Sequence, residues 1–264
     1  MTRADRGDAA PWPCARSGRG VLLVTGGSRG IGASVARSAA LSGWAVCLTY
    51  RANEAAAAAV VDEIESSGGV AAAVQADVAR EADVLAAFAA ADRLGQLAAL
   101  VANAGIVAPR ARLSELSAER VERVLAVNVL GSILCCREAV RRLSTRQGGR
   151  GGSIVLVSSI AARIGAPGEY IDYAASKGAV DTLGRGLARE VADEGIRVNV
   201  VRPGTIDTDI HAENGQPDRA ARVGRTVPLG RPGQANEVAA AILWLLGAEA
   251  GYCTGAMLDV SGGL

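Results

Sequence analysis

The sequence predicts an α/β fold in which a parallel sheet of seven strands is covered by helices on both faces. Short apolar segments alternate with helix-length segments from residue 20 onward, as expected when a helix follows each strand. The strand segments are apolar on both sides, which is typical of strands buried on both faces. No internal repeat and no second-domain boundary interrupts this order, so we expect one domain over residues 20–264.

Each strand is expected where five to seven mainly apolar residues lie between turn or helix signals. In order, these segments are Val21–Thr25, Trp44–Tyr50, Val70–Gln75, Ala98–Ala102, Ser153–Val157, Ile196–Val201 and Ala256–Val260. The predicted helices run from the first glycine turn to about Ser42, then over Glu54–Ser66, Glu81–Arg93, Ser117–Leu143, a segment that contains Tyr173 and ends at Gly195, and Asn236–Leu246.

Composition and charge exclude several classes of function. The net charge is +1, from 28 basic and 27 acidic side chains, so we expect no nucleic-acid partner and no acidic membrane surface. The longest apolar run has nine residues, against about 20 for a membrane span. The five cysteines lack metal-ligand spacing and suggest free thiols in a reducing, cytoplasmic setting. Residues 1–19 lack the apolar stretch of a secretory signal, and we expect a disordered tail.

The first predicted strand leads into a glycine-rich turn, Gly26-Gly-Ser-Arg-Gly-Ile-Gly32, and then into a helix. Glycines let a backbone approach a pyrophosphate, and a helix N-terminus supplies free N–H groups and a positive dipole. The spacing differs from the common Gly-x-Gly-x-x-Gly, so this turn alone is equally consistent with a cofactor site and with a tight turn.

The end of the second strand predicts which cofactor is bound. Enzymes that prefer NAD tend to place a carboxylate there, against the ribose hydroxyl. This chain has Tyr50 and then Arg51, and a second arginine, Arg29, lies within the glycine turn. Two guanidinium groups would pair with a 2′-phosphate, so we predict NADP(H) as the preferred cofactor and NAD(H) as the alternative.

Tyr173 and Lys177 lie four residues apart and should share one face of a helix. A free tyrosine has a pKa of about 10, and a nearby ammonium group would bring it toward neutral pH, where it can exchange protons. An isolated pair of this kind would usually be coincidental. Other polar groups accompany it at the carboxyl ends of strands, namely the turn Asn103-Ala-Gly105 and Ser158-Ser159, and Asn128 lies in the middle of an apolar helix.

Together these residues resemble the short-chain dehydrogenase/reductase family, over residues 20–264. The motifs that carry the resemblance, in the family's order, are Thr25-Gly-Gly-Ser-Arg-Gly-Ile-Gly32, Asp77-Val78, Asn103-Ala-Gly105, Asn128, Ser158-Ser159, Tyr173-x-x-x-Lys177 and Pro203-Gly-Thr-Ile-Asp-Thr208. The resemblance implies a single Rossmann-type, doubly wound domain with a seven-stranded parallel sheet.

The resemblance also implies roles for individual residues. Tyr173 would be the general acid or base, Lys177 would hold the nicotinamide ribose and lower the tyrosine pKa, Ser159 would bind the substrate oxygen and Asn128 would position a water. The implied cofactor contacts are Gly26, Ser28, Arg29, Gly30, Ile31, Gly32, Tyr50, Arg51, Asp77, Val78, Asn103, Ala104, Gly105, Tyr173, Lys177, Pro203, Gly204, Ile206 and Thr208.

Two positions depart from the family pattern. Ser159 precedes Tyr173 by 14 residues, one more than is common in the family, so the intervening loop is expected to contain an extra residue. Ala102 stands where many members have an asparagine, at a position that is structural and variable.

We expect an NADP(H)-dependent oxidoreductase that interconverts a carbonyl and an alcohol. The segment from Ser158 to Lys177 is similar to bacterial glucose 1-dehydrogenases and 3-oxoacyl-carrier-protein reductases. A polar segment over residues 207–230 has the profile of a mobile lid and favours a hydroxylated substrate, whereas Arg163, Arg219, Arg222 and Arg225 would suit a carrier protein.

Two other classes of protein fit the sequence less well. A cofactor-sensing binding protein without turnover is the alternative, and a methyltransferase is disfavoured because the tyrosine and lysine would have no role in it. His211, in the expected lid, suggests a solvated or substrate-contacting side chain and not a metal ligand. In similar proteins the two long helices pair across a two-fold axis and the C-terminal segment makes a second interface, which together imply a homotetramer.

Overall fold

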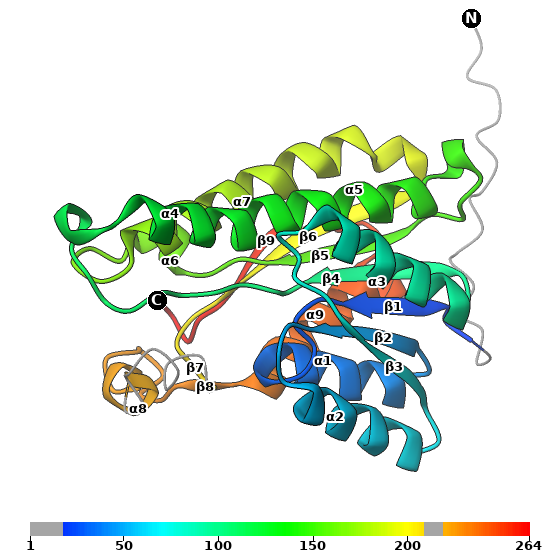
Figure 1. Ribbon diagram of the computed structural model, residues 1–264, viewed down its shortest axis with the longest axis horizontal. Coiled ribbons are helices and arrows are strands. Elements are labelled where there is room, and N and C mark those ends of the chain that lie inside the picture. The colour runs from blue at the N-terminus through cyan, green and yellow to red at the C-terminus, as the bar shows by residue number, and fades with distance from the viewer. Residues whose placement is uncertain (1–17, 209–218) are drawn as a thin grey trace, which may run out of the picture.

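Seven parallel strands form the central sheet, in the order β3-β2-β1-β4-β5-β6-β9 (Figure 1). The computed structural model describes residues 18–208 and 219–264. The strands are β1 Val21–Val24, β2 Ala45–Tyr50, β3 Val70–Gln75, β4 Leu97–Ala102, β5 Gly152–Val157, β6 Ile196–Pro203 and β9 Met257–Val260. All seven predicted strands are present, and the predicted fold class is confirmed.

Helices cover both faces of the sheet. Their bounds are α1 Gly30–Leu41, α2 Glu54–Ser66, α3 Glu81–Leu94, α4 Ala118–Leu125, α5 Gly131–Leu143, α6 Ala161–Ile164, α7 Ile171–Glu190, α8 Arg219–Gly224 and α9 Ala235–Leu246. Helices α1, α2 and α9 pack on one face, and α3, α5 and α7 pack on the other. Short 3₁₀ turns occupy Leu113–Glu115, Thr145–Gln147, Ala192–Glu194 and Ala248–Ala250.

The core consists of two apolar clusters, one on each side of the sheet. Buried valine, leucine and alanine side chains dominate both clusters, and Phe88 is the one phenylalanine of the chain. The four described cysteines are free thiols, three of them buried, and burial raises the pKa of the Cys47 and Cys135 thiols to about 12. Close packing on both faces holds the strand ends in fixed positions.

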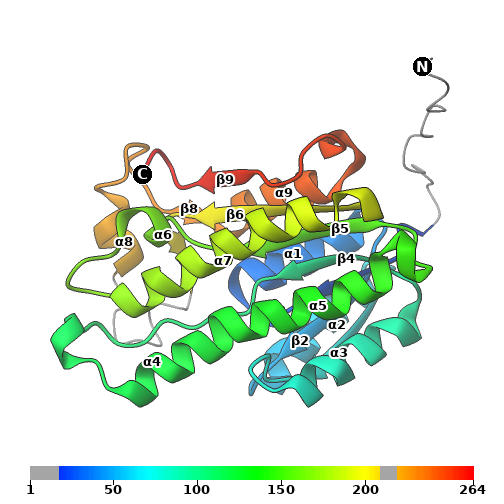
Figure 2. The same cartoon turned by 90° about the horizontal axis from the view of Figure 1, so that it is seen from above.

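The helix predicted over Ser117–Leu143 is not one uninterrupted α-helix. Ser117 caps the start of α4, where its hydroxyl accepts from the Arg120 N–H at 3.3 Å. A π-helical turn, Ala126–Leu130, then separates α4 from α5 and contains Asn128. A π-turn inserts a residue into the helical repeat and is frequent at functional sites. Figure 2 shows α4 and α5 continuing along one line beside α7.

The segment predicted as a lid is partly described. Residues 209–218, including His211, lie outside the described residues. The flanking residues form α8 and a two-stranded parallel sheet of β7 Ile206–Asp207 and β8 Gly233–Gln234, which was not predicted. The tail predicted over residues 1–19 also lies outside the described residues, apart from residues 18 and 19.

The order of the strands creates a crevice at one edge of the sheet. From β1, the next two strands along the chain, β2 and β3, are added on one side of β1. The chain then crosses over, and β4, β5 and β6 are added on the other side of β1. Where the strand order reverses, the loops after adjacent strands diverge and leave room for a ligand. Here that point is at the carboxyl ends of β1 and β4.

Candidate active site

A cavity of about 890 Å³ opens at the carboxyl edge of the sheet. The loops that follow β1, β2, β3, β4, β5 and β6 all contribute to its lining. Of the predicted site residues, all line the cavity except Gly32 and Asn128. Among the described residues, no three His, Cys, Asp or Glu side chains gather in a group that could hold a metal ion.

The glycine turn is shaped for an anion. Gly26 and Gly30 have φ values of +64° and +52°, in the region that favours glycine. A Cβ on Gly32 would lie 2.2 Å from the carbonyl oxygen of Gly26, so the turn closes tightly on the start of α1. No side chain caps α1, and its first turn has no acidic residue. Its N–H groups and dipole therefore fit a pyrophosphate.

Thr25 and Asn103 hold this turn against the end of β4. The Thr25 hydroxyl oxygen accepts from the backbone N–H groups of Asn103 and Ala104, each at 3.0 Å. The Asn103 side-chain amide donates to the carbonyl oxygens of Thr25 at 2.9 Å and Gly26 at 3.0 Å. Asn103 thus joins the ends of β1 and β4. Thr25 was quoted in the glycine-turn motif, but its role in holding the turn was not predicted.

Tyr173, Ser159 and Lys177 meet between β5 and α7. Tyr173 forms a side-chain hydrogen bond with Ser159. Ser159 also accepts from the Ala161 N–H at 3.1 Å. Lys177 donates to the Val157 carbonyl oxygen at 2.7 Å, and its ammonium nitrogen lies 5.7 Å from the centre of the Tyr173 ring. These three side chains therefore form one cluster of hydroxyl and amine groups within the cavity.

Ser158 differs from Ser159 in its surroundings. Its side chain is buried, and its hydroxyl donates to the Lys177 carbonyl oxygen at 3.0 Å. Ser158 therefore anchors α7 to the end of β5. The hydroxyl beside Tyr173 is that of Ser159.

Comparisons with known proteins agree with this geometry. A family model described as enoyl-(acyl carrier protein) reductase matches residues 26–264. The chain is 53% identical over 244 residues to the uncharacterized oxidoreductase YgfF of Escherichia coli (strain K12), across 92% of this chain and 99% of that protein. It is 41% identical over 247 residues to 3beta-hydroxysteroid dehydrogenase 1 of Eggerthella lenta, across 92% of each.

A solved structure of a short-chain dehydrogenase is similar to this chain in both sequence and fold. A short-chain dehydrogenase from Burkholderia cenocepacia J2315, in complex with NADP, is 36% identical, with a TM-score of 0.84 over 94% of this chain and 99% of that chain. The chain belongs to the short-chain dehydrogenase/reductase family. It is an oxidoreductase of that family. The predicted likeness to glucose 1-dehydrogenases and 3-oxoacyl-carrier-protein reductases is confirmed, because proteins of both names are among its relatives.

In this short-chain dehydrogenase/reductase, the Tyr173 pKa differs from the sequence-based expectation. We expected the Lys177 ammonium group to lower it. Instead, burial raises the pKa of Tyr173, and the hydrogen bond with Ser159 offsets only part of that rise. The expectation was wrong because residue spacing indicates that two side chains share a helix face, but not how strongly each is desolvated.

Lys177 is the only lysine in the chain, which otherwise has arginine at every basic position. It is buried, and burial lowers its pKa to about 8, while the charge of Asp181 acts in the opposite direction. A guanidinium group keeps its charge, whereas a buried ammonium group titrates readily. The single lysine is a sequence signal that could have set this position apart from the arginines.

Asn128 does not line the cavity, but it is hydrogen-bonded to two segments that do. It is fully buried, and its side-chain oxygen accepts from the Ile106 N–H at 2.8 Å. Its side-chain nitrogen donates to the Ile106 carbonyl oxygen at 3.0 Å and to the Ser176 hydroxyl at 2.9 Å. Through these hydrogen bonds, the Asn128 side chain links the segment after β4 to α7, the helix that carries Tyr173.

Two ion pairs at the site were not predicted. Arg120 on α4 makes two hydrogen bonds, at 2.8 and 3.2 Å, with the buried Asp172 next to Tyr173, and so ties α4 to α7. At the other end of the cavity, Arg123 donates to Asp77 at 2.8 Å. Burial acts to raise the Asp77 pKa, but hydrogen bonds from Arg123 and Ala79 hold it below its usual range. Nothing in the local sequence around Arg120 or Arg123 distinguishes these two arginines from the other arginines of the chain.

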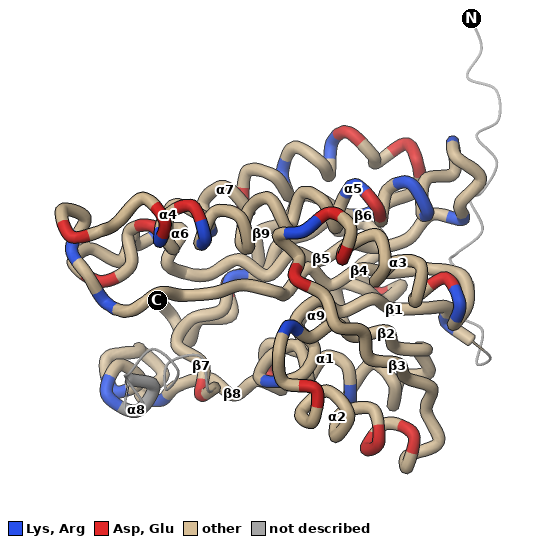
Figure 3. The backbone as a smooth tube through the Cα atoms, in the orientation of Figure 1, with Lys and Arg blue, Asp and Glu red and all other residues tan. Residues whose placement is uncertain are grey.

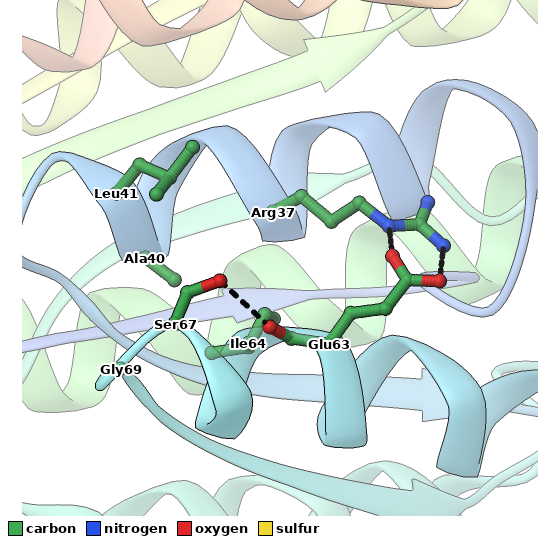
Figure 4. A pocket seen from close by; sticks show the side chains of 7 residues that line it. All are labelled: Arg37, Ala40, Leu41, Glu63, Ile64, Ser67 and Gly69. Atoms are coloured by element: carbon green, nitrogen blue, oxygen red, sulfur yellow. Dashed lines mark hydrogen bonds and ion pairs between the residues drawn. The ribbon is translucent and has the colours of Figure 1, made fainter.

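A second, much smaller hollow lies between α1 and α2, as Figure 4 shows. Arg37 and Glu63 form an ion pair beside it, and Ser67 donates to the Glu63 carbonyl oxygen at 3.0 Å. It contains none of the predicted site residues. The Arg37–Glu63 pair links two surface helices, which is a structural role.

Proposed function

We propose that this oxidoreductase is NADP(H)-dependent and interconverts a carbonyl and an alcohol, with Tyr173 as the general acid or base. The observation that carries the proposal is that one cavity is lined both by the glycine turn, whose N–H groups would suit a pyrophosphate, and by Tyr173, Ser159 and Lys177. The neighbour solved with NADP supports the same cofactor class.

The residues of the chain suit proton transfer to a carbonyl oxygen. The bound nicotinamide would supply the hydride. Tyr173 would donate its hydroxyl proton to that oxygen, and its raised pKa keeps the proton in place at neutral pH. Ser159 would donate a hydrogen bond to the same oxygen, and the Lys177 ammonium group would stabilise the phenolate that Tyr173 becomes.

The expected activity is oxidation of one NADPH for each alcohol formed from a carbonyl. A protein that binds NADPH but turns over no carbonyl would instead be the cofactor-sensing binding protein of the alternative hypothesis. The acyl-thioester alternative depends on basic groups near α8, where Figure 3 shows arginines. It is weakened at Arg163, whose guanidinium group pairs with Asp259.

Arg29 and Arg51 line the cavity where a 2′-phosphate would lie, and both are exposed. We expect Arg51→Ala to weaken NADPH binding about 10- to 100-fold and to leave NADH binding unchanged, since a hydrogen bond to a charged group contributes about 1.5–3 kcal/mol. Calorimetric titration with both cofactors measures this. The control is Arg93→Ala, at the far end of α3, which should change neither affinity. Equal wild-type affinities for NADPH and NADH would contradict the proposed preference.

We also propose a cytoplasmic homotetramer. Leu125, Leu130 and Ile133 on the α4–α5 line are 40%, 44% and 43% exposed. Trp244 on α9 and Tyr252 are also exposed, at 46% and 104%. Exposed apolar side chains on the α4–α5 line and in the C-terminal part of the chain would suit two kinds of contact between copies. No described helix is long and apolar enough to cross a membrane. A monomeric mass by light scattering at micromolar concentration would refute the tetramer.

A further inference from the structure

Lys177 is buried beside a neutral partner. It is 4% exposed, and its ammonium group donates to the Val157 carbonyl oxygen at 2.7 Å. A carbonyl oxygen satisfies one donor but carries no formal charge to offset that of the ammonium group. Burial favours the neutral amine, whereas the proposed mechanism needs the ammonium charge to stabilise the Tyr173 phenolate. The fold should therefore contain a negative charge that acts on Lys177.

One turn further along α7, Asp181 supplies a buried carboxylate. Lys177 and Asp181 are four residues apart and share a face of the helix, which places their Cβ atoms about 5–6 Å apart. Asp181 is 7% exposed, so little water separates the two side chains and their attraction is screened less than at the surface. In agreement, burial lowers the Lys177 pKa and the charge of Asp181 acts to raise it.

Arg202 on β6 binds only one oxygen of this carboxylate. The Arg202 Nε and Nη2 atoms both reach Oδ2 of Asp181, at 2.9 and 2.8 Å. The other oxygen, Oδ1, is buried and accepts no hydrogen bond from any described residue. An unpaired buried oxygen costs stability, and such groups are often found where a side chain has a functional role.

The positive charge of Arg202 is shared with a second carboxylate. Its Nη1 atom lies 3.4 Å from Oδ1 of Asp259 on β9, and Asp259 also pairs with Arg163 on α6. The ion pairs therefore join α6, β9, β6 and α7 in one network. Asp181 is the member of this network that lies on the helix of Lys177.

The other charged groups on the elements packed against this part of α7 are exposed or already engaged. β5 and the π-turn have no charged side chain. On α4 and β6, Glu119 and Glu122 are exposed, Arg120 pairs with Asp172, Arg123 pairs with Asp77, and Arg197 binds carbonyl oxygens at the end of α9. Asp181 is therefore the buried carboxylate that shares a helix face with Lys177.

We propose that Asp181 is a positioning residue that keeps the Lys177 side chain protonated in the active site. This inference deepens the proposed function and rests on it, because the ammonium charge matters only if Tyr173 becomes a phenolate. With a pKa of about 8, Lys177 is charged in about nine of ten molecules at pH 7. A pKa about one unit lower would leave about half of them charged.

The first arm of the test is the pKa of Lys177 in Asp181→Asn, read by NMR from the chemical shift of the only lysine side chain. We expect the pKa to fall by about one pH unit, the lower end of what a nearby opposite charge contributes. A merely structural role predicts the opposite sign, because loosened packing admits water and raises the pKa of a buried lysine toward its ordinary value. A rise, or no change, would overturn the proposal.

Two further variants keep the test valid if Asp181→Asn does not fold. The double variant Asp181→Leu/Arg202→Met removes the ion pair without leaving either charge buried alone, a replacement that proteins often tolerate. It should also lower the Lys177 pKa, by less than Asp181→Asn, because the repulsion from Arg202 is removed too. Asp181→Glu keeps the charge and should keep the pKa near 8. An unchanged or raised pKa in the double variant would overturn the proposal.

Asp193→Asn is the matched control. Asp193 lies beyond the end of α7, its side chain is 68% exposed, and it pairs with Arg146 at the surface. Removal of its charge should leave the Lys177 pKa unchanged, since solvent screens exposed charges. A shift as large as that in Asp181→Asn would show that any lost carboxylate has this effect, and would overturn the specific role of Asp181.

The second arm is the pH profile of kcat/KM, measured by NADPH oxidation with whichever carbonyl is reduced from a panel of sugars, diketones and acyl-thioester mimics. The limb that falls at high pH should move to lower pH by about one unit in Asp181→Asn and stay in place in Asp181→Glu. An unmoved limb in Asp181→Asn would overturn the catalytic effect of Asp181. Absence of NADPH oxidation with every carbonyl would overturn the proposed function, whatever the NMR result.

Discussion

Tyr173→Phe is expected to lower kcat about 10²- to 10⁴-fold while NADPH still binds. The substitution removes the hydroxyl that forms the hydrogen bond with Ser159 and leaves the ring in its half-buried place beside Lys177. Proton donation to the carbonyl oxygen would then depend on solvent water. Steady-state kinetics and a binding titration on the same preparation separate the two effects.

The matched control for this variant is Tyr252→Phe. Tyr252 is fully exposed and lies outside the cavity, so loss of its hydroxyl should not alter kcat. If Tyr173→Phe kept the wild-type kcat, Tyr173 would not be the proton donor, and the proposed mechanism would fail. Loss of NADPH binding in this variant would indicate a structural role for the hydroxyl.

Lys177 is expected to titrate with a pKa of about 8, well below its ordinary value, because it is buried. Protein grown with isotope-labelled lysine should give a single lysine side-chain signal by NMR, since the chain has no other lysine. Its chemical shift against pH then measures this pKa directly. A titration near the ordinary value of about 10.4 would contradict the burial argument.

This shift has a consequence for stability. Below a pH of about 8, Lys177 is charged in both the folded and unfolded states, and its burial cost is fully present. Between about 8 and 10.5 the folded state loses its proton first, so the unfolded state binds more protons and the free energy of unfolding rises with pH. The shift corresponds to roughly 3 kcal/mol.

Lys177→Met provides the reference for that measurement, because Tyr173 and every other titrating group are the same in both proteins. We expect the free energy of unfolding of wild type, relative to this variant, to rise across that pH window by roughly 3 kcal/mol. A constant difference between the two proteins would refute the linkage.

The sequence predicted those parts of the fold that depend on neighbouring residues. Strands such as β1 Val21–Val24 and β5 Gly152–Val157 are buried along their whole length because both faces of the sheet are covered, and that burial is visible in composition. The glycine turn and the Tyr173–Lys177 pair were also predictable, because each needs particular residues at fixed local spacing. The cavity contains nearly all of these positions.

The sequence did not predict features that depend on pairs distant along the chain. Arg120 and Asp172 are 52 residues apart, and Arg123 and Asp77 are 46 apart, so no local pattern links them. The π-turn at Asn128 was missed because its apolar neighbours fit an α-helix equally well. The Tyr173 pKa was wrong because desolvation depends on the whole fold.

The most direct test of the account is transfer of a labelled hydride. NADPH that carries deuterium at the reactive carbon of its nicotinamide ring is incubated with the protein and each member of a panel of sugars, diketones and acyl-thioester mimics, and the products are analysed by mass spectrometry. We predict, for whichever carbonyl is reduced, an alcohol with one deuterium on the carbon that bore the carbonyl oxygen. An unlabelled alcohol, or no alcohol from any member of the panel while the protein binds NADPH, would contradict hydride transfer in this cavity.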